Sequence, residues 1–490
     1  MDVRVRFAPS PTGYLHVGGL RTALYNYLFA RHHGGKCILR IEDTDRTRFV
    51  ENAQENLIEG LTWAGITFDE GPHVGGAFGP YVQSERFHLY KDYGKRLLEN
   101  GAAYYAFDTA EELDAMRERQ QKAGIAPKYD RTVMRNQYTL GLDEAKRLVE
   151  EGAEYVVRLK VPATAVVRFR DVIRGEVVVQ GKDVDDQILL KSDGFPTYHL
   201  ANVVDDHLMK ITHVIRGEEW LPSTPKHVLL YEAFGWETPQ FAHLPLLLNQ
   251  NKAKLSKRQG DVAVEDFRAK GYLREAFVNF IALLGWNPTS DREIFSMEEL
   301  IETFTLEKVN KSGAVFDVKK LDWMNAQYLR STPPERLAGD LANLLNENGM
   351  PSFDMEYLKK VVILLLERVT FVRDIPGFGS YMFGKPTQYE EEYIRKRWKE
   401  DTLTLIEPLI EKFKTLDEWT HDSLHDATKA RAEEAGAKLG DAIHPLRIMI
   451  TGKSVGAGMF ETMEVLGKEE CLERIQYFLD NKVYEKPFTR

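Results

Sequence analysis

The sequence predicts an α/β fold in which a doubly wound parallel sheet carries an inserted α+β domain and is followed by an all-helical region. Three observations support this prediction. A strand–helix–strand unit opens the chain, β-rich segments follow a charged helix near residue 110, and helical periodicity continues beyond residue 261. At 490 residues the chain is also too long for one hydrophobic core, since a domain commonly holds about 100–200 residues.

The opening unit is the clearest element. Residues 3–7 alternate apolar and basic side chains, which is the period of a strand with one polar face. Leucines then recur every fourth position from Leu20 to Leu28, which predicts a helix, and the glycines at 34–35 end it. A second apolar run at 37–41 completes a βαβ unit, which is typical of a Rossmann-like parallel sheet.

The segment from about residue 101 to residue 185 is predicted to be a domain inserted into the first. It begins with a charged stretch of helical character at 111–122, and residues 155–160 and 177–179 then have the composition of strands. Apolar runs at 188–190 and 213–215 predict that the parallel sheet then resumes.

Composition limits the classes of protein that fit. No run of about 18 apolar residues occurs, and the N-terminus has no signal or transit peptide, so we expect no membrane contact and a cytoplasmic location. The two cysteines, Cys37 and Cys471, cannot build a disulfide framework and fit a reducing compartment. The net charge of −10 argues weakly against a nucleic-acid partner, although a basic stripe can coexist with it.

A first candidate for phosphate binding is residues 16–19, His-Val-Gly-Gly, which follow a predicted strand and open a helix. A helix start presents unpaired backbone N–H groups and a positive dipole end. Gly18 and Gly19 let a ligand approach the backbone, and the His16 imidazole can donate to a phosphate oxygen. Taken alone, such a string is more often an ordinary helix start.

The second candidate is residues 254–258, Lys-Leu-Ser-Lys-Arg, in a loop before a helix. Three cations in five residues usually form a solvated turn. In nucleotidyl transfer, however, ammonium groups stabilise the charge that develops on the α-phosphate and the leaving pyrophosphate. On one doubly wound framework the two strings together predict a split nucleotide site, with His16, Lys254 and Lys257 as its catalytic residues.

The order of these two strings resembles that of class I aminoacyl-tRNA synthetases. Further segments resemble bacterial-type glutamyl-tRNA synthetases and cover nearly the whole chain: residues 6–13, 40–45, 69–72, 79–86, 214–219, 321–325 and 466–469. The resemblance implies a glutamate–tRNA ligase. Such an enzyme activates L-glutamate with ATP and transfers it to the 3′ end of tRNA(Glu), with release of AMP and pyrophosphate, in protein synthesis.

The resemblance also implies the binding residues. Those for ATP are Thr12, His16, Gly18, Gly19, Glu219, Trp220, Leu247, Lys254, Ser256 and Lys257. Those for glutamate are Arg6, Ala8, Ser10, Glu42, Tyr198, Asn202 and Arg216. A guanidinium suits the glutamate side-chain carboxylate and rejects the neutral amide of glutamine, while Glu42 can pair with the α-ammonium. In isolation, any of these charged residues is more often part of a structural ion pair.

The expected cofactors are ATP as substrate and Mg²⁺ accompanying it. Some family members hold zinc in the inserted domain through cysteines and a histidine, but residues 106–108 and 129–135 here contain neither. We therefore expect no structural zinc, with hydrophobic packing in its place. The predicted divisions are a catalytic domain at 1–100 and 186–250, an acceptor-end-binding insert at 101–185, a lysine-loop and stem-contact domain at 251–325, and a helical anticodon-binding region at 326–490.

The expected partners are tRNA(Glu), L-glutamate and ATP, and the expected oligomeric state is a monomer. Two alternatives use the same fold. Enzymes that load a modified anticodon base of aspartate tRNA lack the helical C-terminal half, and a catalytically dead tRNA-binding paralogue should have lost the phosphate-handling residues. The basic cluster at 395–397 is either a tRNA contact or a solvated helix face, and residues 445–447 and 452–453 match positions near the anticodon. Whether tRNA(Gln) is also charged stays open.

Overall fold

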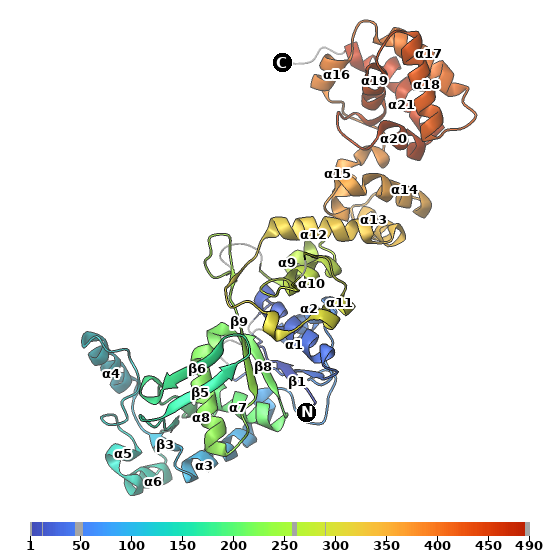
Figure 1. Cartoon of the computed structure of the whole chain (residues 1–490). Helices are drawn as coiled ribbons and strands as arrows, with labels where there is room; N and C mark the ends of the chain where they lie inside the picture. The colour runs from blue at the N-terminus through green and yellow to red at the C-terminus, as the bar shows by residue number, and fades with distance from the viewer. Residues whose placement is uncertain (1, 12, 45–51, 257–261, 290, 486–490) are drawn as a thin grey trace. The chain divides into compact units, whose positions relative to one another are not determined.

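The computed structural model describes residues 2–11, 13–44, 52–256, 262–289 and 291–485. The chain divides into two compact units (Figure 1). The first consists of Met1–Lys270 and Arg274–Val318, and the second of Gly271–Leu273 and Lys319–Arg490. The finer division into five ranges stays a prediction.

The predicted βαβ unit is confirmed. Strand β1 (Arg4–Phe7) runs parallel to β2 (Lys36–Leu39), and α1 (Val17–His32) connects them. The leucine stripe of α1 is buried, at about 1.5–3 kcal/mol for each leucine taken out of water. His33 caps the C-terminal end of the helix, and Gly34 follows with a left-handed φ of 62°.

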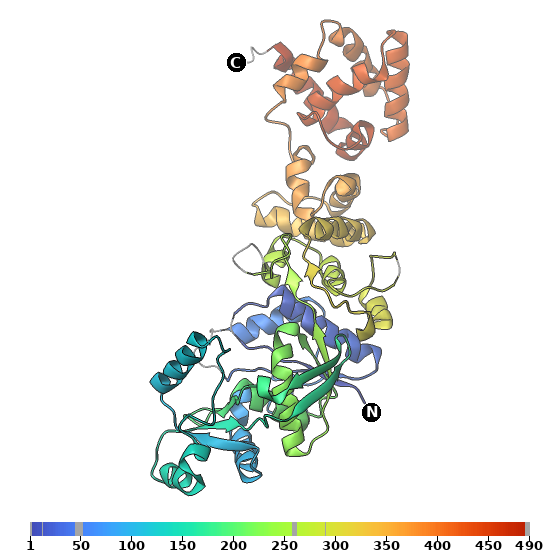
Figure 2. The same cartoon turned by 60° about the vertical axis from the view of Figure 1, so that its left-hand side comes forward.

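A second sheet of four strands lies beside β1. Thr212 N–H donates to the Arg4 carbonyl at 2.9 Å, which joins β1 to the start of β8 (His213–Gly217). From there the order is β8, β9 (Gln240–Leu244), β5 (Val166–Asp171) and β6 (Gly175–Gln180). The pairs β8–β9 and β9–β5 are parallel, whereas β5–β6 is an antiparallel hairpin (Figure 2).

The inserted segment forms a separate antiparallel sheet of β3 (Ala103–Ala106), β4 (Val156–Leu159) and β7 (Ile188–Leu190). The prediction that the parallel sheet resumes at 188–190 is therefore wrong, because β7 pairs antiparallel with β4. A three-residue apolar run does not reveal which strand it pairs with, so sequence periodicity could not decide this point.

Helices surround these sheets and begin where the sequence offers caps; α4, for example, starts at a capping box of Thr109 and Glu112. A large apolar core joins α7 and α8 to the strands, with Leu200, Val203 and Leu230 fully buried. The remaining elements of this unit are α2 (Ala53–Trp63), α3 (Phe87–Glu99), α4 (Ala110–Lys122), α5 (Gln137–Leu140), α6 (Leu142–Glu150), α7 (Tyr198–Leu208), α8 (Thr224–Phe234), α9 (Val264–Ala269), α10 (Arg274–Ala282), α11 (Met297–Thr303), and the parallel pair β10 (Leu247–Leu248) and β11 (Ala314–Val315).

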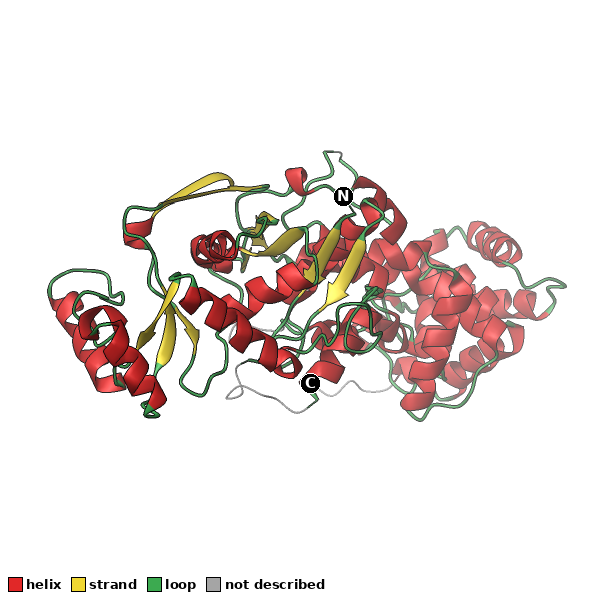
Figure 3. Ribbon diagram, turned by 90° about the horizontal axis from the view of Figure 1, so that it is seen from below, coloured by secondary structure: helices red, strands yellow, loops and turns green. Residues whose placement is uncertain are grey.

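In its described residues between 319 and 485, the second unit consists of helices and the loops that connect them, with no strand (Figure 3). Its C-terminal helices share one core that includes Leu409, Phe413, Leu446 and Phe478. The predicted all-helical region is thus confirmed. Helix α12 (Val318–Ser331) begins one residue before the second unit does. The other helices are α13 (Pro334–Glu347), α14 (Met355–Leu365), α15 (Ile375–Phe378), α16 (Glu391–Arg397), α17 (Thr402–Lys414), α18 (His421–Glu434), α19 (Leu439–Thr451), α20 (Met459–Leu466) and α21 (Lys468–Asp480).

None of the helices in the described ranges combines the length and the apolar character needed to cross a membrane.

Candidate active site

One cavity of about 330 Å³ brings the two predicted nucleotide strings together in the first unit. Its walls come from the start of α1, the end of β8 and the β10 hairpin. Six of the ten predicted ATP-binding residues line it: His16, Gly18, Gly19, Glu219, Leu247 and Lys254. The other lining residues are Arg21, Thr22, Gly217, Pro245, Leu246 and Leu255.

His16 caps helix α1 at this cavity. Its Nδ1 accepts a hydrogen bond from the Gly18 N–H at 3.0 Å, so the neutral imidazole carries its proton on Nε2. The Val17 N–H donates to the Val262 carbonyl at 2.8 Å, which fixes the first turn. The arrangement presents an N–H donor and a helix dipole of the sign that favours phosphate.

Lys254 is placed by a short backbone hairpin. The Leu255 N–H donates to the Leu247 carbonyl at 2.9 Å, and the Asn249 N–H donates to the Ala253 carbonyl at 2.8 Å. Lys252 turns the chain with a left-handed φ of 59°. The backbone is therefore held at the cavity while the Lys254 side chain is exposed to solvent, as a cation that engages a bound phosphate requires.

The structure describes two of the other four predicted ATP residues, Ser256 and Trp220, and neither lines the cavity. Thr12 and Lys257 lie outside the described residues. Ser256 follows the hairpin but is not among the lining residues. Trp220 packs instead against Tyr198, with ring centroids 4.2 Å apart, and keeps 38% of its surface exposed.

The segment after β8 is anchored by two adjacent acidic residues. Glu218 accepts from the Leu246 N–H at 2.8 Å and pairs with Arg174. A Cβ at Gly217 would lie 2.2 Å from a carboxylate oxygen of Glu219, so only glycine at 217 permits the present position of Glu219. These contacts hold the end of β8 against the chain that leads into the lysine hairpin.

Arg21 is a cavity residue that the sequence reasoning missed. Its guanidinium donates to the Pro245 carbonyl and, at 3.1 Å, to the Leu284 carbonyl. One turn later, the Tyr25 hydroxyl lies 3.0 Å from the carbonyl oxygens of Ala282 and Leu284. The spacing of four residues along α1 was a signal that could have indicated this second, polar stripe on the helix.

A buried ionic cluster occupies the predicted glutamate side of the site. Asp206 accepts from Arg6 Nε at 3.0 Å and from Arg40 Nη1 at 2.7 Å. Arg40 also donates to Glu42 at 2.9 Å, and Asn202 Nδ2 donates to the same Glu42 oxygen at 3.2 Å. We call these five residues the Arg40 cluster.

The pKa values of two carboxyl groups in the Arg40 cluster are shifted in opposite directions. Burial raises the pKa of Glu42 above its usual range, although Arg40 and Arg6 oppose the shift. Burial also acts to raise the pKa of Asp206, but attraction to Arg6 and Arg40 outweighs it, so this pKa is lowered. Glu42 is thus the carboxylate that would gain most from an additional cation.

Arg216 lies in a second cluster of different character. It donates to the Tyr198 hydroxyl at 2.8 Å, to Thr224 Oγ1 at 3.0 Å and to His243 Nε2 at 3.1 Å, and it lies 3.4 Å from His227 Nδ1. No carboxylate in the described ranges forms an ion pair with it. A buried guanidinium with only uncharged partners favours an anionic ligand. We call Arg216 and these four partners the Arg216 cluster.

The two clusters meet at Tyr198. Burial raises the pKa of its hydroxyl, Arg216 and Arg6 oppose that shift, and Glu42 adds to it. Tyr198 and Asn202 lie on one face of α7, four residues apart, and Asp206 continues that face. Helix α7 therefore supplies side chains to both clusters.

The loop after β1 completes the predicted glutamate set. Ala8 and Ser10 flank Pro9, whose carbonyl accepts from the Glu42 N–H at 2.9 Å, so this loop lies beside Glu42. Asp206, Arg40 and His243 were not predicted. The four-residue spacing from Tyr198 could have indicated Asp206, whereas nothing in the sequence links His243 to Arg216.

The stretch where some relatives hold zinc is filled by other contacts here. Asp108 accepts from the Tyr129 hydroxyl at 2.5 Å and from the Arg135 N–H at 2.6 Å. Around them Tyr104, Ala106, Met116, Tyr129 and Met134 form an apolar cluster. A carboxylate and a phenol are a poor donor set for structural zinc. Within the described ranges, no group of three or more metal-binding side chains occurs.

Comparisons with known proteins agree with this geometry. Residues 2–323 match the family of tRNA synthetases class I (E and Q), catalytic domain, and residues 336–479 match the anticodon binding domain. The glutamate–tRNA ligase of Chlorobium luteolum is 51% identical over 487 residues, which are 97% of this chain and 97% of that protein. That of Chloroherpeton thalassium is 52% identical, over 99% of both chains.

A solved structure extends the likeness to three dimensions. The crystal structure of a glutamate tRNA ligase from Elizabethkingia meningosepticum in complex with its amino acid has a TM-score of 0.93 and 43% identity, and the match covers 99% of this chain and 100% of that one. As the sequence predicted, this chain belongs to the family of class I tRNA synthetases for glutamate and glutamine.

Proposed function

We propose that this chain is a glutamate–tRNA ligase, which uses ATP to attach L-glutamate to the 3′ end of tRNA(Glu). The observation that carries the proposal is the shared cavity of His16 and Lys254. Its lining residue Gly217 directly follows the buried Arg216 on β8, and Arg216 forms no ion pair with a carboxylate in the described ranges. The relatives that match over nearly their whole length carry the same name. The chain acts as a monomer in the cytoplasm.

The first step forms glutamyl-adenylate. An α-carboxylate oxygen of glutamate attacks the α-phosphorus of ATP, the bond from that phosphorus to the bridging oxygen breaks, and pyrophosphate leaves with the electron pair. No protein nucleophile is needed. His16 and the first-turn amides of α1 hold phosphate oxygens, while Lys254 and Lys257 stabilise the charge that develops during transfer. Mg²⁺ enters as part of the ATP complex.

The remaining ATP contacts surround the base and ribose. Leu247 supplies apolar surface and Glu219 supplies a hydrogen-bond acceptor, and both residues line the cavity. Thr12, Trp220 and Ser256 are proposed contacts on the family resemblance.

Glutamate recognition divides between the two clusters. Arg216, with Arg6, receives the side-chain carboxylate, and Tyr198 supports Arg216 through its hydroxyl. Glu42, with Asn202 and the loop of Ala8 and Ser10, receives the α-ammonium. Glutamine is rejected because its neutral amide leaves the buried guanidinium without an anion.

The second step transfers the amino acid. A hydroxyl of the terminal ribose attacks the carbonyl carbon of the adenylate, the carbon–oxygen bond to AMP breaks, and the hydroxyl proton is lost. The helical second unit supplies tRNA recognition. Residues 395–397, 445–447 and 452–453 are the proposed contacts there, because basic side chains neutralise phosphates.

A charging assay tests the proposal directly. Purified protein, ATP with Mg²⁺, labelled glutamate and bacterial tRNA should yield acid-precipitable glutamyl-tRNA, and ribonuclease digestion should place the label on the terminal adenosine. A label on an anticodon base would favour the modified-base alternative, and no product at all would refute the proposal. Lys254→Ala serves as the inactive control. Separate tRNA(Glu) and tRNA(Gln) samples decide whether both are charged.

A further inference from the structure

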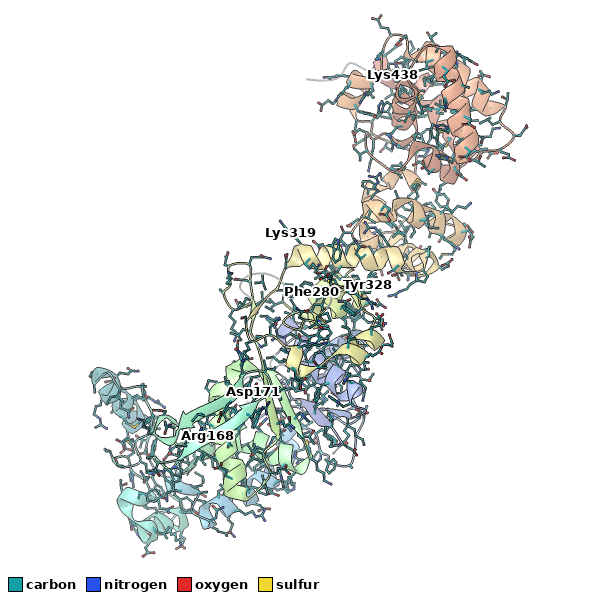
Figure 4. All side chains as sticks on the ribbon, in the orientation of Figure 1. Arg168, Asp171, Phe280, Lys319, Tyr328 and Lys438 are labelled. Atoms are coloured by element: carbon teal, nitrogen blue, oxygen red, sulfur yellow. The ribbon has the colours of Figure 1, made fainter. Side chains whose placement is uncertain are left out.

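A buried chain of hydrogen bonds runs from Asp171 through His243 to Arg216. Asp171 Oδ2 lies 2.6 Å from His243 Nδ1, and His243 Nε2 lies 3.1 Å from Arg216 Nε. The side chains of Asp171 and His243 are 0% exposed. Asp171 stands at the end of β5 (labelled in Figure 4), and His243 and Arg216 face each other as register partners on β9 and β8.

Both ends of this chain require the same tautomer of His243. A carboxylate can only accept, so Nδ1 carries the proton. Arg216 Nε–H can only donate, so Nε2 must offer its lone pair. The imidazole is therefore neutral, with its acceptor Nε2 directed at Arg216 Nε and also 3.1 Å from Thr224 Oγ1.

Asp171 is itself fixed. Its Oδ1 accepts from the Ile173 N–H at 2.9 Å and from the Arg174 N–H at 2.8 Å, in the turn between β5 and β6. Its Oδ2 also accepts from the His243 N–H at 3.1 Å. The carboxylate thus cannot rotate away without breaking the turn.

We propose that His243, oriented by Asp171, is a positioning residue that holds Arg216 ready for the side-chain carboxylate of glutamate. This inference rests on the proposed function, in which Arg216 binds that carboxylate. His243 lies on the side of Arg216 that faces β5 and β9, so it acts through Arg216 rather than on the substrate. With Nε pinned, the two terminal nitrogens are directed toward Tyr198 and Thr224.

The neutral imidazole of His243 can orient Arg216 without neutralising its charge, which a carboxylate could not do. A carboxylate next to Arg216 would orient the guanidinium but would also neutralise it, and it would compete with the ligand. The imidazole supplies orientation, while the charge of Asp171 stays one ring further away. Burial lowers the pKa of His243, and Arg216 lowers it further, so the imidazole stays neutral near pH 7 although Asp171 opposes the shift.

Two amide substitutions at His243 form a matched pair. A glutamine amide oxygen reaches the place of Nε2 and can accept from Arg216, whereas an asparagine amide reaches only the place of Nδ1. We expect His243→Asn to raise the KM for glutamate about 10- to 100-fold in tRNA-dependent ATP–pyrophosphate exchange, with the KM for ATP within about twofold. His243→Gln should restore the KM for glutamate to within about threefold of the wild-type value.

Asp171→Asn tests the tautomer independently. An amide N–H facing Nδ1 forces the proton to Nε2, where it meets the Arg216 N–H, so the KM for glutamate should rise as in His243→Asn. Thermal melts of all variants establish that the fold is intact. Equal effects of His243→Asn and His243→Gln, or a parallel rise in both KM values, would overturn the inference in favour of a purely structural role.

Arg216→Met separates the two levels of the proposal. If it leaves the KM for glutamate unchanged, the assigned role of Arg216 fails. If it raises that KM while His243→Asn and Asp171→Asn do not, only the positioning role fails.

Discussion

The Arg40 cluster and the Arg216 cluster hold the same buried guanidinium group in opposite environments. Arg40 pairs with Glu42 at 2.9 Å and Asp206 at 2.7 Å, and the Asp205 carboxylate lies 3.9 Å from its Nε. Arg216 contacts a phenol, an alcohol and two imidazoles. The Arg40 guanidinium is therefore already paired with carboxylates, whereas Arg216 has no carboxylate partner in the described ranges. The difference teaches that Arg40, whose charge is paired, supports the structure of the site, whereas the unpaired charge of Arg216 is suited to binding an anionic ligand.

The largest expected effect is on stability, in the Arg40 cluster. Arg40→Met leaves Asp206 and Glu42 with one cation fewer in a buried place, which should lower the free energy of unfolding by about 3–5 kcal/mol. Urea unfolding measures it. Arg216→Met is the control, because it removes a buried charge that pairs with no carboxylate in the part of the chain that the structure describes, and it should cost no more than about 1 kcal/mol. A larger loss for Arg216→Met would reverse the assignment.

The next effect is on catalysis, in the Arg216 cluster. Arg216→Met should lower kcat/KM for glutamate about 10²- to 10³-fold, because the ligand carboxylate would be buried without its partner. The KM for ATP should change by less than about threefold. Initial rates of pyrophosphate exchange at varied glutamate and ATP measure both. Equal impairment of the two substrates would contradict the division between the clusters.

The two clusters should also contribute to stability over different ranges of pH. Burial lowers the pKa of His227 well below its usual range and that of His199 to about 3, with Arg216 adding to both shifts. Each histidine binds a proton in the unfolded chain near pH 6.5 but not in the fold. Its contribution to stability is therefore present above pH 6.5 and is lost as the pH falls below it.

His227→Asn should reduce the slope of the free energy of unfolding against pH by up to about 1.4 kcal/mol per pH unit between pH 6 and pH 5. Asp206, whose pKa is lowered, contributes above about pH 3.9 and loses its contribution only below that value. Urea titrations at pH 7, 6 and 5 test the difference. An unchanged slope in His227→Asn would mean that this histidine is already charged in the fold.

The smallest effect concerns a single hydrogen bond. Tyr198→Phe removes the hydroxyl that accepts from Arg216 at 2.8 Å and should raise the KM for glutamate about 3- to 10-fold. Tyr90→Phe, on the Asp205 carboxylate, is the matched control and should leave that KM unchanged. An equal change in the KM for glutamate in Tyr198→Phe and Tyr90→Phe would contradict a specific role for the Tyr198 hydroxyl.

The periodicity of apolar residues predicted those helices and strands whose pattern is contained within one segment of the sequence. The βαβ unit, the helix after the two prolines of the first loop and the helical second unit all follow from spacing within one segment. The pairing of β7 with β4 was missed, because strand partners are chosen by packing across the chain. His16 and Lys254, which line one cavity, could be singled out as candidate nucleotide-binding residues because each lies in a recognisable string.

The supporting side chains could not be found in this way. Asp171 and His243 are 72 residues apart and meet only through the sheet. Arg40 was quoted within a motif, yet its two carboxylate partners come from different elements. Two predicted residues, Thr12 and Lys257, lie outside the described ranges, and their roles stay predictions.

The tethers of helix α1 limit where this polypeptide can be shortened. Arg21 and Tyr25 bond to carbonyl groups at Ala282 and Leu284, well beyond the last strand of the main sheet. A fragment that stops after Leu248 would contain every strand of that sheet and still lose the brace behind His16. One that continues to Val318 keeps it, so a minimal adenylate-forming piece of this enzyme extends past the lysine hairpin to the start of α12.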